Sequence, residues 1–342
     1  GAATGAGTGT LNGGTASVTV NGNFTVPNYQ ATTGTTSLGG ATVTLSTFGH
    51  NNGTVQLTRN GAQALTTNAQ SFNNLTITNS GTDVTTATGT LTVVGNLDVQ
   101  ANQTLAVGNN VLSVTGTTGN AGTVTLGTAA ATLTGLVTNT AAGVLTGSSG
   151  TITLAGGITG GTFTASSTTT GVGGTFAPSV FNNNSGLVVF DGGAAQSFGS
   201  YGFDDLEIDN AAGVSITAGP VTVSGGLTLS AGTLASAGFA LSVTGTLDFA
   251  GGSVTSSGTV TASGDIIRSG GGLSSTGTLA LTGTAVQALD FTGSALSTLS
   301  VTKTGGTATA GSDFSVSVYS QTGAGGTFSV PGARTMTVGT SA

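Results

Sequence analysis

The chain has 342 residues, only 4% of them charged, and a formal net charge of −7. Its four basic residues are far apart in the sequence and form no basic patch, which argues against nucleic-acid binding. There is no cysteine, so disulfides and thiolate metal sites are excluded. No apolar run approaches the roughly 20 residues that a membrane-spanning helix needs.

The N-terminal region, residues 1–40, is rich in Gly, Thr and Ala. Its apolar pattern predicts two strands, at Ser17–Val20 and Phe24–Val26. We expect this region to be strand and coil and to contact another subunit.

Residues 41–154 carry apolar pairs separated by one polar residue. Alternation over three or four residues predicts a short strand with one buried face, and Gly or Asn in the gaps predicts tight turns. We expect a first solenoid segment here, with strands that recur every six to eight positions at Leu91/Val93, Leu97/Val99, Leu105/Val107 and Leu112/Val114.

Residues 155–186 are rich in Gly and Asn, which predicts a loop or hinge. The alternating pattern returns over residues 187–342, where we expect a second solenoid segment that ends in C-terminal strands. Its clearest apolar pairs are Val221/Val223, Leu227/Leu229, Leu241/Val243 and Leu247/Phe249.

Three consecutive strand steps give a turn of about 20–21 residues, made of three short strands. The sequence therefore predicts an all-β fold, a right-handed parallel β-helix of about 16 turns stacked about 4.8 Å apart. Apolar residues would point inward, and Thr, Ser and Asn would form outward ladders. The alternative is a row of β-sandwich modules, whose turn signals usually come at intervals of about 8–12 residues.

One passage occurs three times, as Thr54–Leu65, Leu187–Phe198 and Thr278–Leu289. Val55 matches Leu279 and Ile77 matches Val301, so the first and third copies keep a constant offset without a gap. Such repetition predicts stacked units. A glutamine occupies the same place in each copy, and our first interpretation is an outward ladder, with a buried corner as the alternative: Gln63, Gln196 and Gln287.

The sequence predicts no catalytic residue and no bound cofactor other than calcium. If Leu206 and Ile208 point inward, Asp205, Glu207 and Asp209 share the outward face and could supply oxygen ligands for Ca²⁺. The competing interpretation is an acidic, solvated strand that discourages edge pairing. The single histidine, His50, has no neighbouring Cys, Asp or Glu with which to form a metal site or a triad.

Units such as Gly89–Val99 and Gly219–Leu234, with the Phe-x-x-Leu-x-Ile motifs of Phe72–Ile77 and Phe203–Ile208, carry a family resemblance. Over residues 50–300 the chain resembles bacterial secreted β-solenoid repeat proteins, the filamentous-haemagglutinin-like proteins, autotransporter passengers and surface fibres. The resemblance implies a secreted or cell-surface location, a structural or adhesive role, and no catalytic residues.

We therefore expect a non-enzymatic extracellular structural protein, exported with a signal peptide that is then removed. It would assemble with itself, head to tail, into a filament, sheath or surface layer. The strands predicted at Thr327–Val330 and Met336–Val338 would pair with Val18–Val20 or Phe24–Val26 of the next subunit. The alternatives are an adhesin that binds glycans or another cell, and, less favoured, a β-helix enzyme that cleaves polysaccharides.

Overall fold

A computed structural model describes residues 1–4, 9–79 and 84–339. No helix occurs in these residues, and the strand pairings among them are parallel. The chain forms two compact units, Gly1–Asn184 and Ser185–Ala342, each a stack of turns, with about 16 turns in all. The all-β parallel solenoid is thus confirmed, and the sandwich alternative is wrong. The division between the units falls inside the segment predicted as a loop or hinge, residues 155–186, which also contains five short strands.

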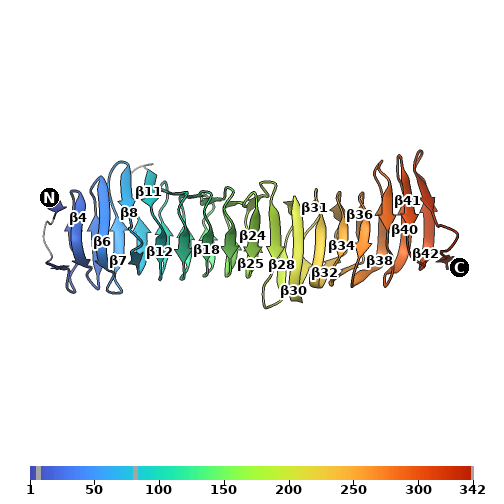
Figure 1. The fold of residues 1–342 in the computed structure, drawn as a ribbon, viewed down its shortest axis with the longest axis horizontal. Helices are drawn as coiled ribbons and strands as arrows, with labels where there is room; N and C mark the ends of the chain where they lie inside the picture. Colours follow the sequence, from blue (N-terminus) through green and yellow to red (C-terminus); the bar gives the residue numbers. More distant parts are fainter. Residues whose placement is uncertain (5–8, 80–83, 340–342) are drawn as a thin grey trace. The chain divides into compact units, whose positions relative to one another are not determined.

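The strands of the first unit line up in three ladders, with neighbouring turns side by side (Figure 1). The first ladder contains β1 (Ala3–Thr4), β2 (Leu11–Asn12), β4 (Phe24–Gln30), β6 (Thr42–Gly49), β8 (Gln63–Thr66), β11 (Val84–Thr88), β14 (Thr104–Gly108), β17 (Thr123–Leu126), β20 (Val144–Thr146), β23 (Thr162–Thr164) and β26 (Val180–Asn182). The second contains β3 (Val18–Val20), β5 (Thr35–Leu38), β7 (Thr54–Leu57), β10 (Asn74–Ile77), β13 (Leu97–Val99), β16 (Thr118–Asn120), β19 (Val137–Asn139), β22 (Gly157–Thr159) and β25 (Thr175–Ala177). The third contains β9 (Ser71–Phe72), β12 (Leu91–Val93), β15 (Leu112–Val114), β18 (Ala131–Leu133), β21 (Ile152–Leu154) and β24 (Thr169–Val172).

The second unit is built in the same way. One ladder contains β27 (Leu187–Phe190), the first part of β30 (Asp205–Ile216) and of β32 (Leu227–Ala237), then β34 (Leu247–Phe249), β37 (Ile266–Arg268), β39 (Gln287–Leu289), β41 (Thr307–Ala310) and β43 (Thr327–Ser329). The other strands are β28 (Gln196–Phe198), β29 (Gly202–Phe203), β31 (Val221–Val223), β33 (Leu241–Val243), β35 (Ser253–Ser256), β36 (Thr259–Ala262), β38 (Gly272–Leu281), β40 (Ala295–Val301), β42 (Phe314–Gln321) and β44 (Met336–Val338).

The register of the ladders sets the length of each turn. Leu75 lies beside Leu97, and Leu97 beside Thr118, so these two turns have nearly the same length. Other turns are shorter, as where Ile158 lies beside Phe176, or longer, as where Ile266 lies beside Leu289. The predicted length of about 20–21 residues is therefore the middle of the range, and corners of different size absorb the difference.

The alternating apolar residues form the core of each unit. Every member of the eight apolar pairs named above is at most 1% exposed. The polar residue between the two apolar ones points outward, as the period-two pattern predicts. Stacked similar turns thus place the apolar side chains of one turn directly on those of the next.

Glycines form a column at one corner of the first unit, at Gly95, Gly116, Gly135, Gly156 and Gly174. A Cβ atom on Gly135 would lie 2.3 Å from the carbonyl oxygen of Gly116, and one on Gly174 would lie 2.3 Å from that of Gly156. Only a residue without a side chain lets the backbones of successive turns approach so closely at this corner.

Candidate functional site

The single histidine lies in the turn that follows β6. His50 accepts a hydrogen bond at Nδ1 from the backbone N–H of Asn52, 3.1 Å away, and so shapes its own turn. No group of three or more His, Cys, Asp or Glu side chains within residues 1–4, 9–79 and 84–339 is arranged to hold a metal ion.

The acidic strand β30 has the predicted orientation. Leu206 and Ile208 are buried, and the carboxylates of Asp205, Glu207 and Asp209 face outward. Asp205 accepts a hydrogen bond from the backbone N–H of Gly226 at 2.7 Å, and Glu207 accepts one from the Ser230 hydroxyl. Two of the three carboxylates thus bind the next turn, and calcium coordination by this trio stays a prediction from the sequence.

In the third copy of the repeated passage, Thr278–Leu289, the corner beside Gln287 holds a buried lysine. It was not singled out in the sequence analysis. The Lys303 side chain is fully buried, and its Nζ donates hydrogen bonds to the carbonyls of Thr282 at 3.2 Å and Ala285 at 2.8 Å. It also donates to Oε1 of Gln287 at 2.8 Å. Burial lowers the pKa of Lys303, because no carboxylate offsets the lost hydration of the ammonium.

The corner of the second copy is closed by neutral groups. Oε1 of Gln196 accepts hydrogen bonds from Nδ2 of Asn210 at 2.8 Å and from the backbone N–H of Gly192 at 3.0 Å. Nδ2 of Asn210 also donates to the carbonyl of Ala194 at 2.8 Å, the same contact that Lys303 makes with Ala285. Asn210 therefore takes the place of Lys303.

The glutamines are buried, so our first interpretation of them, an outward ladder, is wrong. Gln63, Gln196 and Gln287 are 1%, 8% and 0% exposed. Each lies two residues before a buried apolar residue on the same strand, so the alternation itself turns it inward. Asn210 and Lys303 bond to these glutamines, and Asn79 holds the position that corresponds to Lys303. Each of the three lies two positions after a buried apolar residue, so the same parity signal would have identified them.

A groove of about 360 Å³ opens on the second unit beside β37 and β39. Only Ile266 and Leu289 pair there, and Ile267 is 42% exposed at the mouth. Burial alone would raise the pKa of Asp290 in this groove, but hydrogen bonds from Thr292 and Ser312 and the charge of Arg268 together lower it. The groove offers an apolar floor beside one positive and one negative group.

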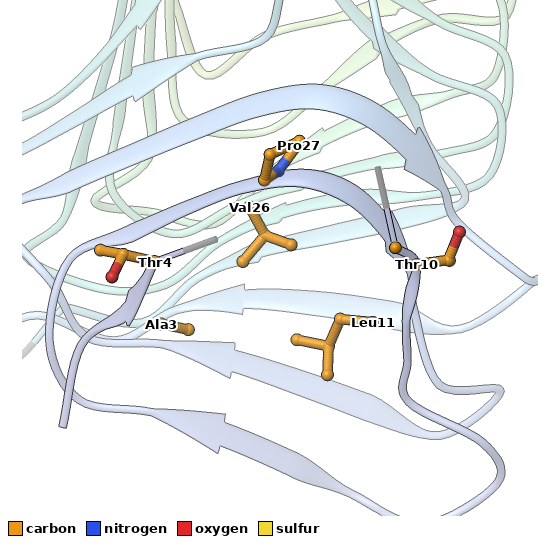
Figure 2. Close-up of a pocket in the computed structure, with 7 residues that line it drawn as sticks. Ala3, Thr4, Thr10, Leu11, Val26 and Pro27 are labelled. Carbon is orange, nitrogen blue, oxygen red and sulfur yellow. The ribbon is translucent and has the colours of Figure 1, made fainter. Parts of the chain in front are cut away.

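The N-terminal edge of the first unit is partly covered by its own chain. Phe24 and Thr25 pair with Ala3 and Thr4, so at these two residues β4 already has a partner on the side opposite β6. Beside this edge lies an open cavity of about 310 Å³, and Figure 2 shows Val26 and Leu11 facing it.

Strand β3, in contrast, has one partner, β5, among the described residues. The carbonyl of Val20 accepts a hydrogen bond from Gly39 N–H at 2.8 Å. Since successive residues of a strand direct their backbone groups to opposite sides, the N–H and C=O of Thr19 point away from β5.

The C-terminal edge of the second unit has the same character. The carbonyl of Thr335 and the N–H of Gly339 bond to Phe314 and Val316, and β44 pairs with β42. The backbone groups of Met336 and Val338 therefore point away from β42.

Comparison with models of protein families, with curated proteins and with solved structures finds no match to this chain. Among the residues that the structure describes, no helix is long and apolar enough to cross a membrane.

Proposed function

We propose that the protein is a non-enzymatic structural protein that polymerises head to tail outside the cell into a filament, sheath or surface layer. The observation that carries this proposal is the pair of strand edges, β3 in the first unit and β44 in the second. Each directs backbone N–H and C=O groups away from its single described neighbour. A parallel strand edge of this kind is a template for another chain.

The surface supports self-association. Only four basic and eleven acidic residues carry a formal charge in the whole chain, so repulsion between copies is weak. Contact between two different edges is heterologous, and when it does not close into a ring it extends into a filament. The resemblance to secreted bacterial β-solenoid proteins supports a location outside the cell.

Sedimentation of the purified chain over a range of concentrations tests the proposal. We expect the mean mass to rise with concentration and fibres to appear in electron micrographs. Replacing Thr19 by proline removes an N–H that points away from β5, so it should block growth while preserving the ladder within the unit.

Thr19→Val is the matched control, because it keeps the N–H and the strand propensity. It should polymerise like the unaltered chain. A monodisperse monomer at high concentration, or equal assembly of Thr19→Pro and Thr19→Val, would contradict the filament.

The second candidate function is adhesion, favoured by the groove beside β37. Its apolar floor, the exposed Ile267 and the charged groups of Arg268 and Asp290 form a concave surface that could take a glycan or a partner protein. Saturable binding to a glycan array that Ile267→Asp abolishes, in a chain that does not polymerise, would place adhesion ahead of assembly.

A further inference from the structure

Gln63 in the first copy and Gln287 in the third make equivalent hydrogen bonds at their corners. Nε2 of Gln63 donates to the carbonyls of Leu38 at 2.8 Å and Gly40 at 2.9 Å. Nε2 of Gln287 donates to Ala262 at 3.2 Å and Gly264 at 2.7 Å, the corresponding positions of the third copy. The structure thus extends the sequence repeat to the level of single hydrogen bonds.

The two corners differ in the group that faces the glutamine. At the constant offset between the copies, the three acceptors of the Lys303 ammonium correspond to the carbonyls of Thr58 and Gly61 and to Oε1 of Gln63. Lys303 itself corresponds to Asn79, whose side chain is shorter.

The first corner consequently contains unpaired polar atoms. Gln63 is 1% and Asn79 3% exposed. Among the described residues, Oε1 of Gln63 and both Oδ1 and Nδ2 of Asn79 have no hydrogen-bond partner. Leaving such atoms buried and unpaired destabilises a fold, so we expect a partner of small size at this corner.

Arg59 adds a fourth such group beside the corner. Its Nε is buried and has no partner in the described part of the chain. A Cβ atom on Gly61 would lie 3.3 Å from this Nε, so the guanidinium lies against Gly61, the counterpart of Ala285. The third copy has Gly283 in place of Arg59. Each of these two corners therefore has one cationic side chain, supplied from a different position.

We propose that the first corner binds one water molecule, at the place that the ammonium of Lys303 fills in the third copy. A water can both accept and donate hydrogen bonds, and the unpaired atoms of this corner include donors, Arg59 Nε and Asn79 Nδ2, as well as acceptors, Gln63 Oε1 and Asn79 Oδ1.

The corner favours water over the two other ways of satisfying these atoms. A metal cation would be repelled by the adjacent guanidinium of Arg59. A direct bond from Asn79 to Gln63 would copy the second corner, in which Asn210 follows Gln196 by 14 positions. Asn79 instead follows Gln63 by 16 positions, the same spacing as between Gln287 and Lys303. The second corner closes over a shorter segment.

High-resolution diffraction from crystals of the full chain tests the proposal, with a parallel soak in a thallium(I) salt as a probe for monovalent cations. We expect a water peak within hydrogen-bond distance of Gln63 Oε1 and Asn79, and no anomalous thallium signal there. The double variant Arg59→Gly, Asn79→Lys reproduces the third corner. It should lose the water and place Nζ against Gln63 Oε1.

A thallium peak at the corner would overturn the proposal in favour of a cation site. Direct contact between Nδ2 of Asn79 and Oε1 of Gln63 in the unaltered chain would overturn it as well. Should the double variant fail to fold, the density of the unaltered chain decides alone.

Discussion

The ammonium of Lys303 lies 2.8 Å from the side-chain oxygen of Gln287, and both side chains are fully buried. Three N–H groups of the ammonium meet three oxygen acceptors, and none of these acceptors is a carboxylate. Since charge buried without a counter-ion is costly, this contact couples the stability of the second unit to the protonation of one lysine.

Replacing Lys303 by methionine keeps most of the side-chain volume and removes the donors. At neutral pH we expect a loss of about 1–3 kcal/mol in the free energy of unfolding, because the Gln287 and Ala285 oxygens are left buried without a donor. Chemical denaturation of the two proteins in parallel measures this loss.

The pH dependence of the same pair gives a second prediction. The folded pKa of Lys303 lies below its ordinary value of 10.5, so the unfolded chain binds more protons between these two pH values. The stability of the unaltered chain relative to Lys303→Met should therefore rise with pH across this window and level off above 10.5. Burial raises the pKa of Tyr29, Tyr201 and Tyr319, but these groups act alike in both proteins. If the difference in the free energy of unfolding between the two proteins stays constant from neutral pH to above 10.5, the lowered pKa of Lys303 is wrong.

Gln63→Ala should destabilise the first unit by about 2–3 kcal/mol. It removes the donor to the carbonyls of Leu38 and Gly40 and leaves a cavity at a 1% exposed position. Gln56→Ala is the control, since Gln56 lies on the outward face of β7 and should cost less than about 0.5 kcal/mol. Equal effects of the two variants in thermal unfolding would restore the outward interpretation of Gln63.

Gly135→Ala tests the glycine column. The added methyl group would lie 2.3 Å from a backbone oxygen that cannot move without breaking the ladder, so we expect a loss of at least about 1–3 kcal/mol. Gly193→Ala places its methyl group where no atom lies within 4 Å, and calorimetry should show a change below about 0.5 kcal/mol.

Asp290 should contribute stability that is lost in acid. Its folded pKa lies below the ordinary 3.8, so its contribution is present above that pH and is lost as the pH falls through the folded pKa. Asp290→Asn has no such titration, and the difference in stability between the two proteins should shrink on acidification below pH 3.8. An acid-unfolding curve unaltered by the substitution would show that Arg268 and Thr292 do not hold this carboxylate.

The alternation of apolar and polar residues predicted the solenoid because each turn repeats the same physical requirement, one buried and one solvated face. The spacing of Leu97 and Val99 was enough to predict that both side chains are buried. The corners were harder, because a polar side chain such as Gln63 is solvated in most settings, and its burial depends on carbonyl acceptors 23 and 25 residues earlier in the chain. Lys303 was missed for the same reason, since its acceptors come from the preceding turn.

The glycine column also determines how such a chain can change in length. Its members follow one another at unequal intervals, wider from Gly95 to Gly116 than from Gly156 to Gly174, so the seam keeps its contact while the rest of each turn varies. Duplicating or deleting one whole turn would join glycine to glycine along this seam and so would keep the close approach of its backbones. Whole turns are thus the units in which this part of the chain can lengthen or shorten without losing the glycine seam.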